Sequence, residues 1–150
     1  MSREWDHYLF RIGDDPASIY LDLGIAATAP VVGLGASVRI SVALRAPAEN
    51  GMSADEEFDD LIALEDHLVA RLHRSDALYV GRLTTRGSRV FYFYASDEEA
   101  FVQSASNAML EKPAYTAQVG CEQDLNWSTY FRFLHPSPRQ LQSIQNRRLN

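Results

Sequence analysis

Four histidines are the first candidates for acid–base chemistry or metal binding: His7, His67, His73 and His135. His67 and His73 are six residues apart, whereas two metal ligands on one helix face need a spacing of three or four residues. His135 precedes Pro136 and has no predicted nucleophile or base beside it. The sequence therefore predicts no catalytic residue, no metal site and no cofactor.

The single cysteine, Cys121, excludes an intrachain disulfide and a zinc site built from several cysteines. The carboxylate of Glu122 beside it disfavours a reactive thiolate. Gly33 and Gly35 precede a predicted strand, although phosphate-binding glycine loops open a helix. These patterns favour a protein without enzymatic activity.

A basic, glycine-containing turn followed by aromatic residues is similar to the RNA-binding strand of RNA-recognition domains. The segment begins at Arg86-Gly87 and continues into Phe91-Tyr92-Phe93-Tyr94. RNA binding would require these rings to be exposed as stacking platforms. The alternative is a central strand that is covered on both faces. Binding of single-stranded RNA is therefore an alternative function, and the exposure of these rings tests it.

Period-two and helical patterns indicate the elements that would position these residues. Alternating apolar residues predict strands, and Ser53, Ser96 and Ser137 each begin a capping-box pattern that predicts a helix start. The expected strands are 5–12, 18–23, 38–44, 79–83, 90–94, 115–119 and 127–134, with helices after Ser53, Ser96 and Ser137.

The order of these elements predicts an α+β protein. Its middle reads strand, helix, strand, strand, helix, strand, which is the ferredoxin-like βαββαβ sandwich. An N-terminal β-hairpin and a C-terminal strand plus helix extend it. No repeat or linker interrupts residues 1–150, so we expect a single domain.

The composition limits the partners. A net charge of −6 and a pI of about 5.1 disfavour binding to nucleic acid or to anionic membranes. No segment has the apolar core of a signal peptide or a membrane span, so a cytoplasmic location is expected. Another protein is the expected partner, and the sequence predicts no oligomeric state.

Two groups of residues are candidate sites. Segregated charges can steer protein contacts, and these predict an interaction surface of Arg82, Arg86, Arg89, Asp55, Glu56, Asp59, Arg139, Arg147 and Arg148. The alternative is a ligand or enzyme pocket near the segment Trp127–His135, lined by Asp124, Trp127, Tyr130 and His135, with Arg82 as a further polar group.

Several motifs together resemble an uncharacterised bacterial family, the domain of unknown function numbered 695. They include Trp5-Asp6, the run Pro16 to Gly24, Tyr79-Val80-Gly81-Arg82 and the run Phe91 to Ala95. Shorter matches are Asn50-Gly51, Glu56-Glu57-Phe58, Leu64-Glu65-Asp66, Pro136-Ser137-Pro138 and the run Ile144 to Arg148.

The resemblance implies no activity and no catalytic residue. In some longer members of the family, a domain similar to regulator of ribonuclease activity B follows this one. The leading hypothesis is therefore a non-enzymatic protein-interaction or regulatory module, and the resemblance implies a link to ribonuclease regulation. A small-ligand-binding domain or enzyme is the alternative.

Overall fold

The computed structural model describes residues 4–149. The strands are β1 (Trp5–Ile12), β2 (Asp15–Asp22), β3 (Ala36–Ala43), β4 (Ala77–Thr85), β5 (Ser88–Ala95) and β6 (Ala117–Gln123). The α-helices are α1 (Phe58–Leu72), α2 (Glu98–Leu110) and α3 (Pro138–Leu149). Three short helical turns are η1 (Gly24–Ala27), η2 (Asp55–Glu57) and η3 (Thr129–Leu134).

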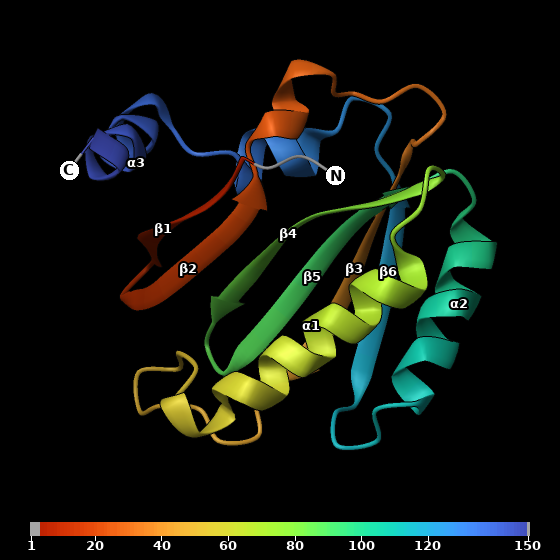
Figure 1. The fold of residues 1–150 in the computed structure, drawn as a ribbon, viewed down its shortest axis with the longest axis horizontal. Helices are drawn as coiled ribbons and strands as arrows, with labels where there is room; N and C mark the ends of the chain where they lie inside the picture. The colour runs from red at the N-terminus through yellow and green to blue at the C-terminus, as the bar shows by residue number, and fades with distance from the viewer. Residues whose placement is uncertain (1–3, 150) are drawn as a thin grey trace.

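All six strands form one antiparallel sheet in the order β1-β2-β4-β5-β3-β6 (Figure 1). Strand β5 lies between β3 and β4, as a split βαβ unit requires. The predicted N-terminal hairpin is confirmed: β1 pairs with β2, which adds both strands beside β4. The α+β class that the sequence predicts is confirmed.

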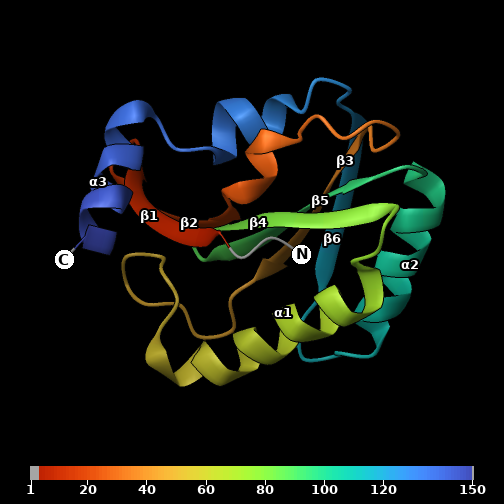
Figure 2. The same cartoon turned by 45° about the horizontal axis from the view of Figure 1, so that its top comes forward.

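The sheet is covered on both faces (Figure 2). Helices α1 and α2 pack on one face, where Phe91 and Phe93 of β5 join the core. The segments η1, η3 and α3 lie over the other face, where Tyr92 and Tyr94 are buried. Because all four rings are at most 5% exposed, they form no stacking platform for RNA. Strand β5 is therefore a central strand that is covered on both faces, which was the alternative to an RNA-binding strand.

The predicted strand over 127–134 is wrong, because this segment forms the helical turn η3. The carboxylate of Asp124 accepts hydrogen bonds from the amides of Ser128 (2.8 Å) and Thr129 (3.0 Å), which start the turn. Trp127, Tyr130 and Leu134 are fully buried at helical spacing. The C-terminal extension is therefore a helical turn followed by a helix. The strand was predicted because the segment is rich in aromatic residues, which are common in strands.

Only one of the three expected capping boxes forms. Ser137 and Gln140 exchange hydrogen bonds at the start of α3, as predicted. At α2 the neighbouring residue Asp97 caps the helix instead, and Ser53 caps nothing because the turn η2 precedes α1. Within residues 4–149, no helix has the length and apolar character needed to span a bilayer.

Candidate functional site

A groove runs along α1 where the sheet extends past the helix toward β2. It consists of two adjoining cavities of about 460 and 290 Å³, both of which are lined by Tyr20, Glu65 and Asp66. A cavity of similar volume, about 450 Å³, lies beside residues 30–36, but Glu98 is the one charged residue in its lining. The groove beside α1 therefore concentrates more groups that can recognise a ligand.

A β-bulge in β4 places Arg82 on the sheet face that lines the groove. Tyr79 pairs with Phe93, whereas Gly81 pairs with Tyr92, so one extra residue enters β4 between them. The bulge shifts the alternation, and Arg82 therefore shares a sheet face with Tyr79 and lies opposite Tyr20 of β2. Without the bulge, Tyr79 and Arg82 would point to opposite faces.

Glycine at position 81 is required by the close approach of β2. A Cβ atom added there would lie 3.1 Å from both the Leu21 Cβ and the Tyr20 carbonyl oxygen. These contacts are tighter than ordinary van der Waals distances, and the Tyr20 carbonyl belongs to a paired strand that cannot easily move. The bulge and its glycine thus fix the position of Arg82 in the groove.

Glu65 of α1 joins the helix to the sheet inside the groove. Its carboxylate accepts a hydrogen bond from the Tyr79 hydroxyl (2.9 Å) and forms an ion pair with Arg82. The Arg82 guanidinium also lies 4.5 Å from the centre of the Tyr20 ring, within cation–π distance. Burial and the adjacent Glu65 charge raise the pKa of Tyr79 well above its usual range.

Arg89 is the second cation of the groove and is only 8% exposed. Its Nε donates to the Thr84 hydroxyl (2.8 Å), and a terminal nitrogen lies 3.5 Å from the Ser53 hydroxyl. No carboxylate of the described residues forms an ion pair with it. Burial, followed by the nearby positive charge of Arg82, lowers the pKa of Arg89 to about 10, so it stays protonated at neutral pH.

The lining of the larger cavity combines two arginines with two carboxylates. Arg82 and Arg89 contribute two positive charges, whereas Glu65 contributes one buried negative charge that Arg82 already neutralises. Asp66 also lines the groove, but it is exposed, and solvent screens its charge. The larger cavity thus holds a buried cation, Arg89, which forms no direct ion pair within residues 4–149, although Glu65 and Glu57 lie near enough to raise its pKa.

The four residues of the predicted pocket lie near one another on the opposite face of the sheet from Arg82. Their polar atoms form hydrogen bonds inside the protein. The Trp127 indole donates to the Leu34 carbonyl (2.8 Å), and the Tyr130 hydroxyl donates to the Asp22 carbonyl (2.6 Å). Asp124 accepts from the Tyr94 hydroxyl (2.7 Å).

His135, the fourth residue of this group, is half-buried. Its Nδ1 lies 3.0 Å from the carbonyl oxygen of Pro136. These contacts hold the C-terminal segment on the sheet, and the structure does not bring Arg82 together with them. The cavity that contains Arg82 is the groove beside α1.

The predicted interaction surface is divided among several places. Arg82 and Arg89 lie in the groove, and Arg86 pairs with Asp15 at the hairpin ends. Asp55, Glu56 and Asp59 are exposed around the start of α1. Arg139 is exposed on α3, and Arg147 and Arg148 bind β1.

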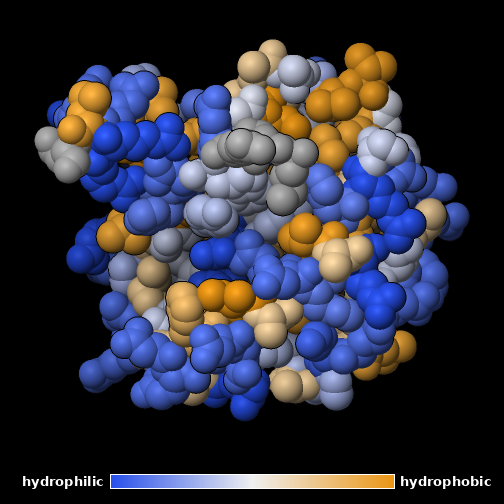
Figure 3. Space-filling model, in the orientation of Figure 1, coloured by the Kyte–Doolittle hydropathy of each residue, from blue (hydrophilic) through white to orange (hydrophobic). Residues whose placement is uncertain are grey.

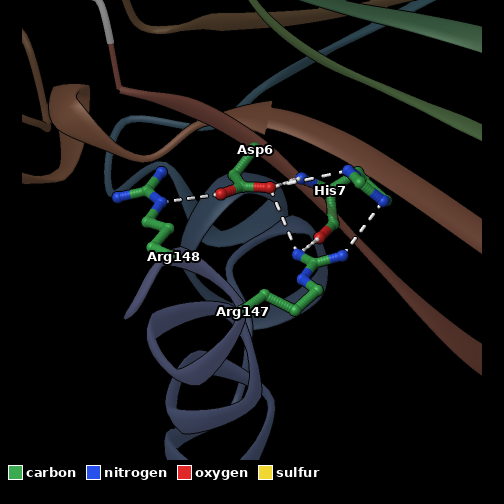
Figure 4. Close-up of polar contacts among 4 residues, drawn as sticks. All are labelled: Asp6, His7, Arg147 and Arg148. Atoms are coloured by element: carbon green, nitrogen blue, oxygen red, sulfur yellow. Dashed lines mark hydrogen bonds and ion pairs between the residues drawn. The ribbon is translucent and has the colours of Figure 1, made fainter. Parts of the chain in front are cut away.

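Arg147 and Arg148 connect α3 to the outer strand of the sheet (Figure 4). Asp6 accepts from Arg148 Nε (2.8 Å) and from a terminal nitrogen of Arg147 (3.2 Å), which also donates to the His7 carbonyl (2.6 Å). Burial alone would raise the pKa of Asp6, but the His7 amide and Arg148 hold it below its usual range. The two arginines are thus used to dock α3.

Replacing Asp6 by asparagine is expected to loosen α3 and to lower the free energy of unfolding by about 1 kcal/mol, since both arginines are half-exposed. Amide hydrogen exchange within α3 is expected to become faster, while exchange in β5 stays unchanged. An Asp15→Asn variant, which breaks the exposed pair with Arg86, serves as the control. Equal exchange in α3 of both variants would contradict this role of Asp6.

The described residues give little support for a cysteine nucleophile or for a metal site. Cys121 is exposed on β6, and partial burial together with Glu98 raises the pKa of its thiol, which disfavours a thiolate nucleophile. Among residues 4–149, no three histidine, cysteine or acidic side chains come together in a way that could hold a metal ion.

Comparisons with known proteins identify a family but no activity. No curated protein matches the chain, and no solved structure matches it. A model of a family of unknown function, DUF695, matches residues 3–135, which include all six strands, α1, α2 and the groove. Helix α3 lies beyond the matched range. The match covers most of the chain, which therefore belongs to the DUF695 family.

Proposed function

We propose that this protein is a binding domain for a small anionic ligand, which carries a phosphate or carboxylate group into the groove beside α1. The observation that carries the proposal is Arg89, a buried cation that lines a cavity and forms no direct ion pair with a carboxylate of residues 4–149. Removing a charge from water costs several kcal/mol unless a counter-charge compensates it. A bound anion would supply that counter-charge and would reduce the repulsion between Arg82 and Arg89.

The groups in the groove support binding more than catalysis. Glu65 is the most buried carboxylate of the groove, and the Tyr79 hydroxyl and Arg82 already occupy its oxygens. Neither a histidine nor a cysteine is among the residues that line the two cavities. A buried arginine with a shifted pKa in a cleft is a frequent property of ligand sites. We therefore propose recognition of an anion without proposing a reaction.

Removing the Arg89 charge is expected to abolish the effect of inorganic phosphate on stability. Phosphate at about 100 times its dissociation constant should stabilise the wild-type protein by about 2.7 kcal/mol. The thermal midpoint is measured against phosphate concentration for the wild type and for Arg89→Met. We expect a saturating increase for the wild type and none for the variant beyond the general salting effect.

Arg86→Met is the matched control, because it removes the same charge from an exposed position outside the groove. Phosphate stabilises most proteins non-specifically, and this contribution should be equal in all three proteins. If Arg89→Met gains as much stability from phosphate as the wild type and Arg86→Met, the proposed function is wrong.

A second candidate function is protein binding, which the exposed start of α1 favours. Phe58 is 60% exposed and Ile62 is 41% exposed, one helical turn apart. The exposed carboxylates of Asp55, Glu56 and Asp59 surround them. On the surface beside α1, hydrophilic atoms surround separate apolar patches (Figure 3). Such a surface suits a partner segment that is basic and partly apolar.

This second candidate predicts that a basic partner binds less tightly at high salt. A variant with Asp55→Asn, Glu56→Gln and Asp59→Asn should lose that partner, whereas Glu99→Gln, at an exposed position on α2, should keep it. Binding that is unchanged in the triple variant would contradict it. The link to ribonuclease regulation stays a prediction.

A further inference from the structure

We infer that the ligand of the groove is an amphipathic molecule, with an anionic head at Arg89 and Arg82 and an aromatic ring beside Trp5. This inference rests on the proposed anion site and adds the chemical class of the ligand. It follows from the different linings of the two cavities and from their shared walls.

The groove is longer than a simple anion. The residues of α1 that line it extend from Phe58 to Ala70, about 18 Å along a helix with a rise of 1.5 Å per residue. Tyr20, Glu65 and Asp66 line both cavities, so the two spaces adjoin along the helix. A phosphate ion fills only a small part of this length. A ligand that uses the whole groove therefore needs a body beyond its charged group.

The linings fix the orientation of such a ligand. Arg82 and Arg89 line only the larger cavity, whereas Trp5 and Tyr79 line only the smaller one. The Trp5 ring lies 5.0 Å from the Tyr20 ring and 5.1 Å from the Tyr79 ring, measured between centroids. The anionic head therefore belongs in the larger cavity, and the apolar body belongs against the aromatic rings of the smaller one.

Trp5 also has an unused hydrogen-bond donor. Its indole Nε1 is buried and has no hydrogen-bond partner among residues 4–149. Buried donors without a partner are uncommon in proteins and call for an explanation. Trp5 lines the smaller cavity, but an atom in that cavity does not reach a nitrogen without exposed surface, so a ligand would contact the ring of Trp5 and not its Nε1.

Isothermal titration calorimetry with two pairs of compounds tests the inference. Phenyl phosphate is compared with inorganic phosphate, and phenylacetate with acetate, so that each pair differs by one aromatic ring. We expect the ring to tighten binding at least tenfold in one pair or in both. Binding of the aromatic compound should also change tryptophan emission, whereas the bare anion should leave it unchanged.

The emission change can be assigned to Trp5. Trp127, the other tryptophan, is fully buried on the opposite face, stacked on Tyr94. The variant Trp5→Phe keeps an aromatic ring, but a smaller one, and removes the fluorophore. It should lose the emission change and weaken binding of the aromatic compound several-fold, with the affinity for the bare anion unchanged. Trp127 therefore remains as an internal reference for correct folding.

The outcomes separate this inference from the proposed function. If the bare anions bind and the ring adds no affinity in either pair, the inference is overturned while the anion site stands. If Trp5→Phe weakens both compounds of a pair equally, Trp5 has a structural role and the inference is also overturned. If no compound binds, the proposed function itself fails.

Discussion

Replacing Trp127 by alanine is expected to lower the free energy of unfolding by about 3–5 kcal/mol. The indole is fully buried and stacks on the Tyr94 ring at 3.9 Å, with an angle of 8° between the planes. Its Nε1 donates to the Leu34 carbonyl (2.8 Å). Truncation leaves a large cavity and an unpaired buried carbonyl, and both effects destabilise the fold. Urea denaturation followed by circular dichroism measures the change.

Phe131→Ala is the control from the helical turn η3, which begins at Thr129, shortly after Trp127. The Phe131 ring is 37% exposed, so its removal should cost less than about 1.5 kcal/mol. If both variants unfold at the same urea concentration, the Trp127 indole does not contribute to the core as the structure indicates. If Trp127→Ala alone is strongly destabilised, the C-terminal segment contributes to the core on the sheet face opposite to α1 and α2.

The strands could be predicted because alternation determines which side chains reach the core. Val38, Ile40 and Val42 alternate with polar residues, and β3 buries all three. The hairpin of β1 and β2 was predictable because Gly13 and Asp14 are turn-forming residues. In the structure Gly13 adopts a positive φ of 61°, which glycine tolerates. Such local patterns are sufficient to predict which face each side chain occupies, provided that no bulge interrupts the pairing of the strand.

The groove could not be predicted from local patterns, because the bulge in β4 changes which face each residue occupies. Arg82 was interpreted as part of a surface or of a pocket near Trp127–His135, and Glu65 was part of neither candidate site. One signal could have located Arg89: it shares the parity of Phe91 and Phe93, which places it on the face that α1 covers. Its position beside a basic turn favoured the surface interpretation instead.

Glu57 is another residue whose role depends on tertiary contacts. The sequence places it among the acidic residues that favour a helix start, yet it is 3% exposed. Its carboxylate accepts hydrogen bonds from the amides of Arg45 and Ala46 (both 2.9 Å) and from the Tyr115 hydroxyl (2.5 Å). It therefore joins the end of β3 to the start of α1 and to the segment before β6. No pattern of adjacent residues encodes this connection.

Replacing Glu57 by alanine is expected to lower the free energy of unfolding by about 2–4 kcal/mol, because three donors lose a charged acceptor. Urea denaturation at neutral pH measures this loss. Glu56→Ala removes the same charge from an exposed neighbour and should change stability by less than about 0.5 kcal/mol. Similar losses in the two variants would contradict a special role for Glu57.

The pH dependence of stability gives an independent test of Glu57. Burial alone would raise its pKa, but the Arg45 amide, the Tyr115 hydroxyl and the Ala46 amide hold the pKa below its ordinary value. A carboxyl group with a lower pKa in the folded state contributes stability above its unfolded pKa of about 4.3. That contribution disappears as the pH falls through the folded pKa. Between pH 6 and pH 3, the wild-type protein should therefore lose more stability than Glu57→Gln, because glutamine does not titrate. If the two proteins lose equal stability over this range, the carboxylate of Glu57 is not stabilised by its three donors.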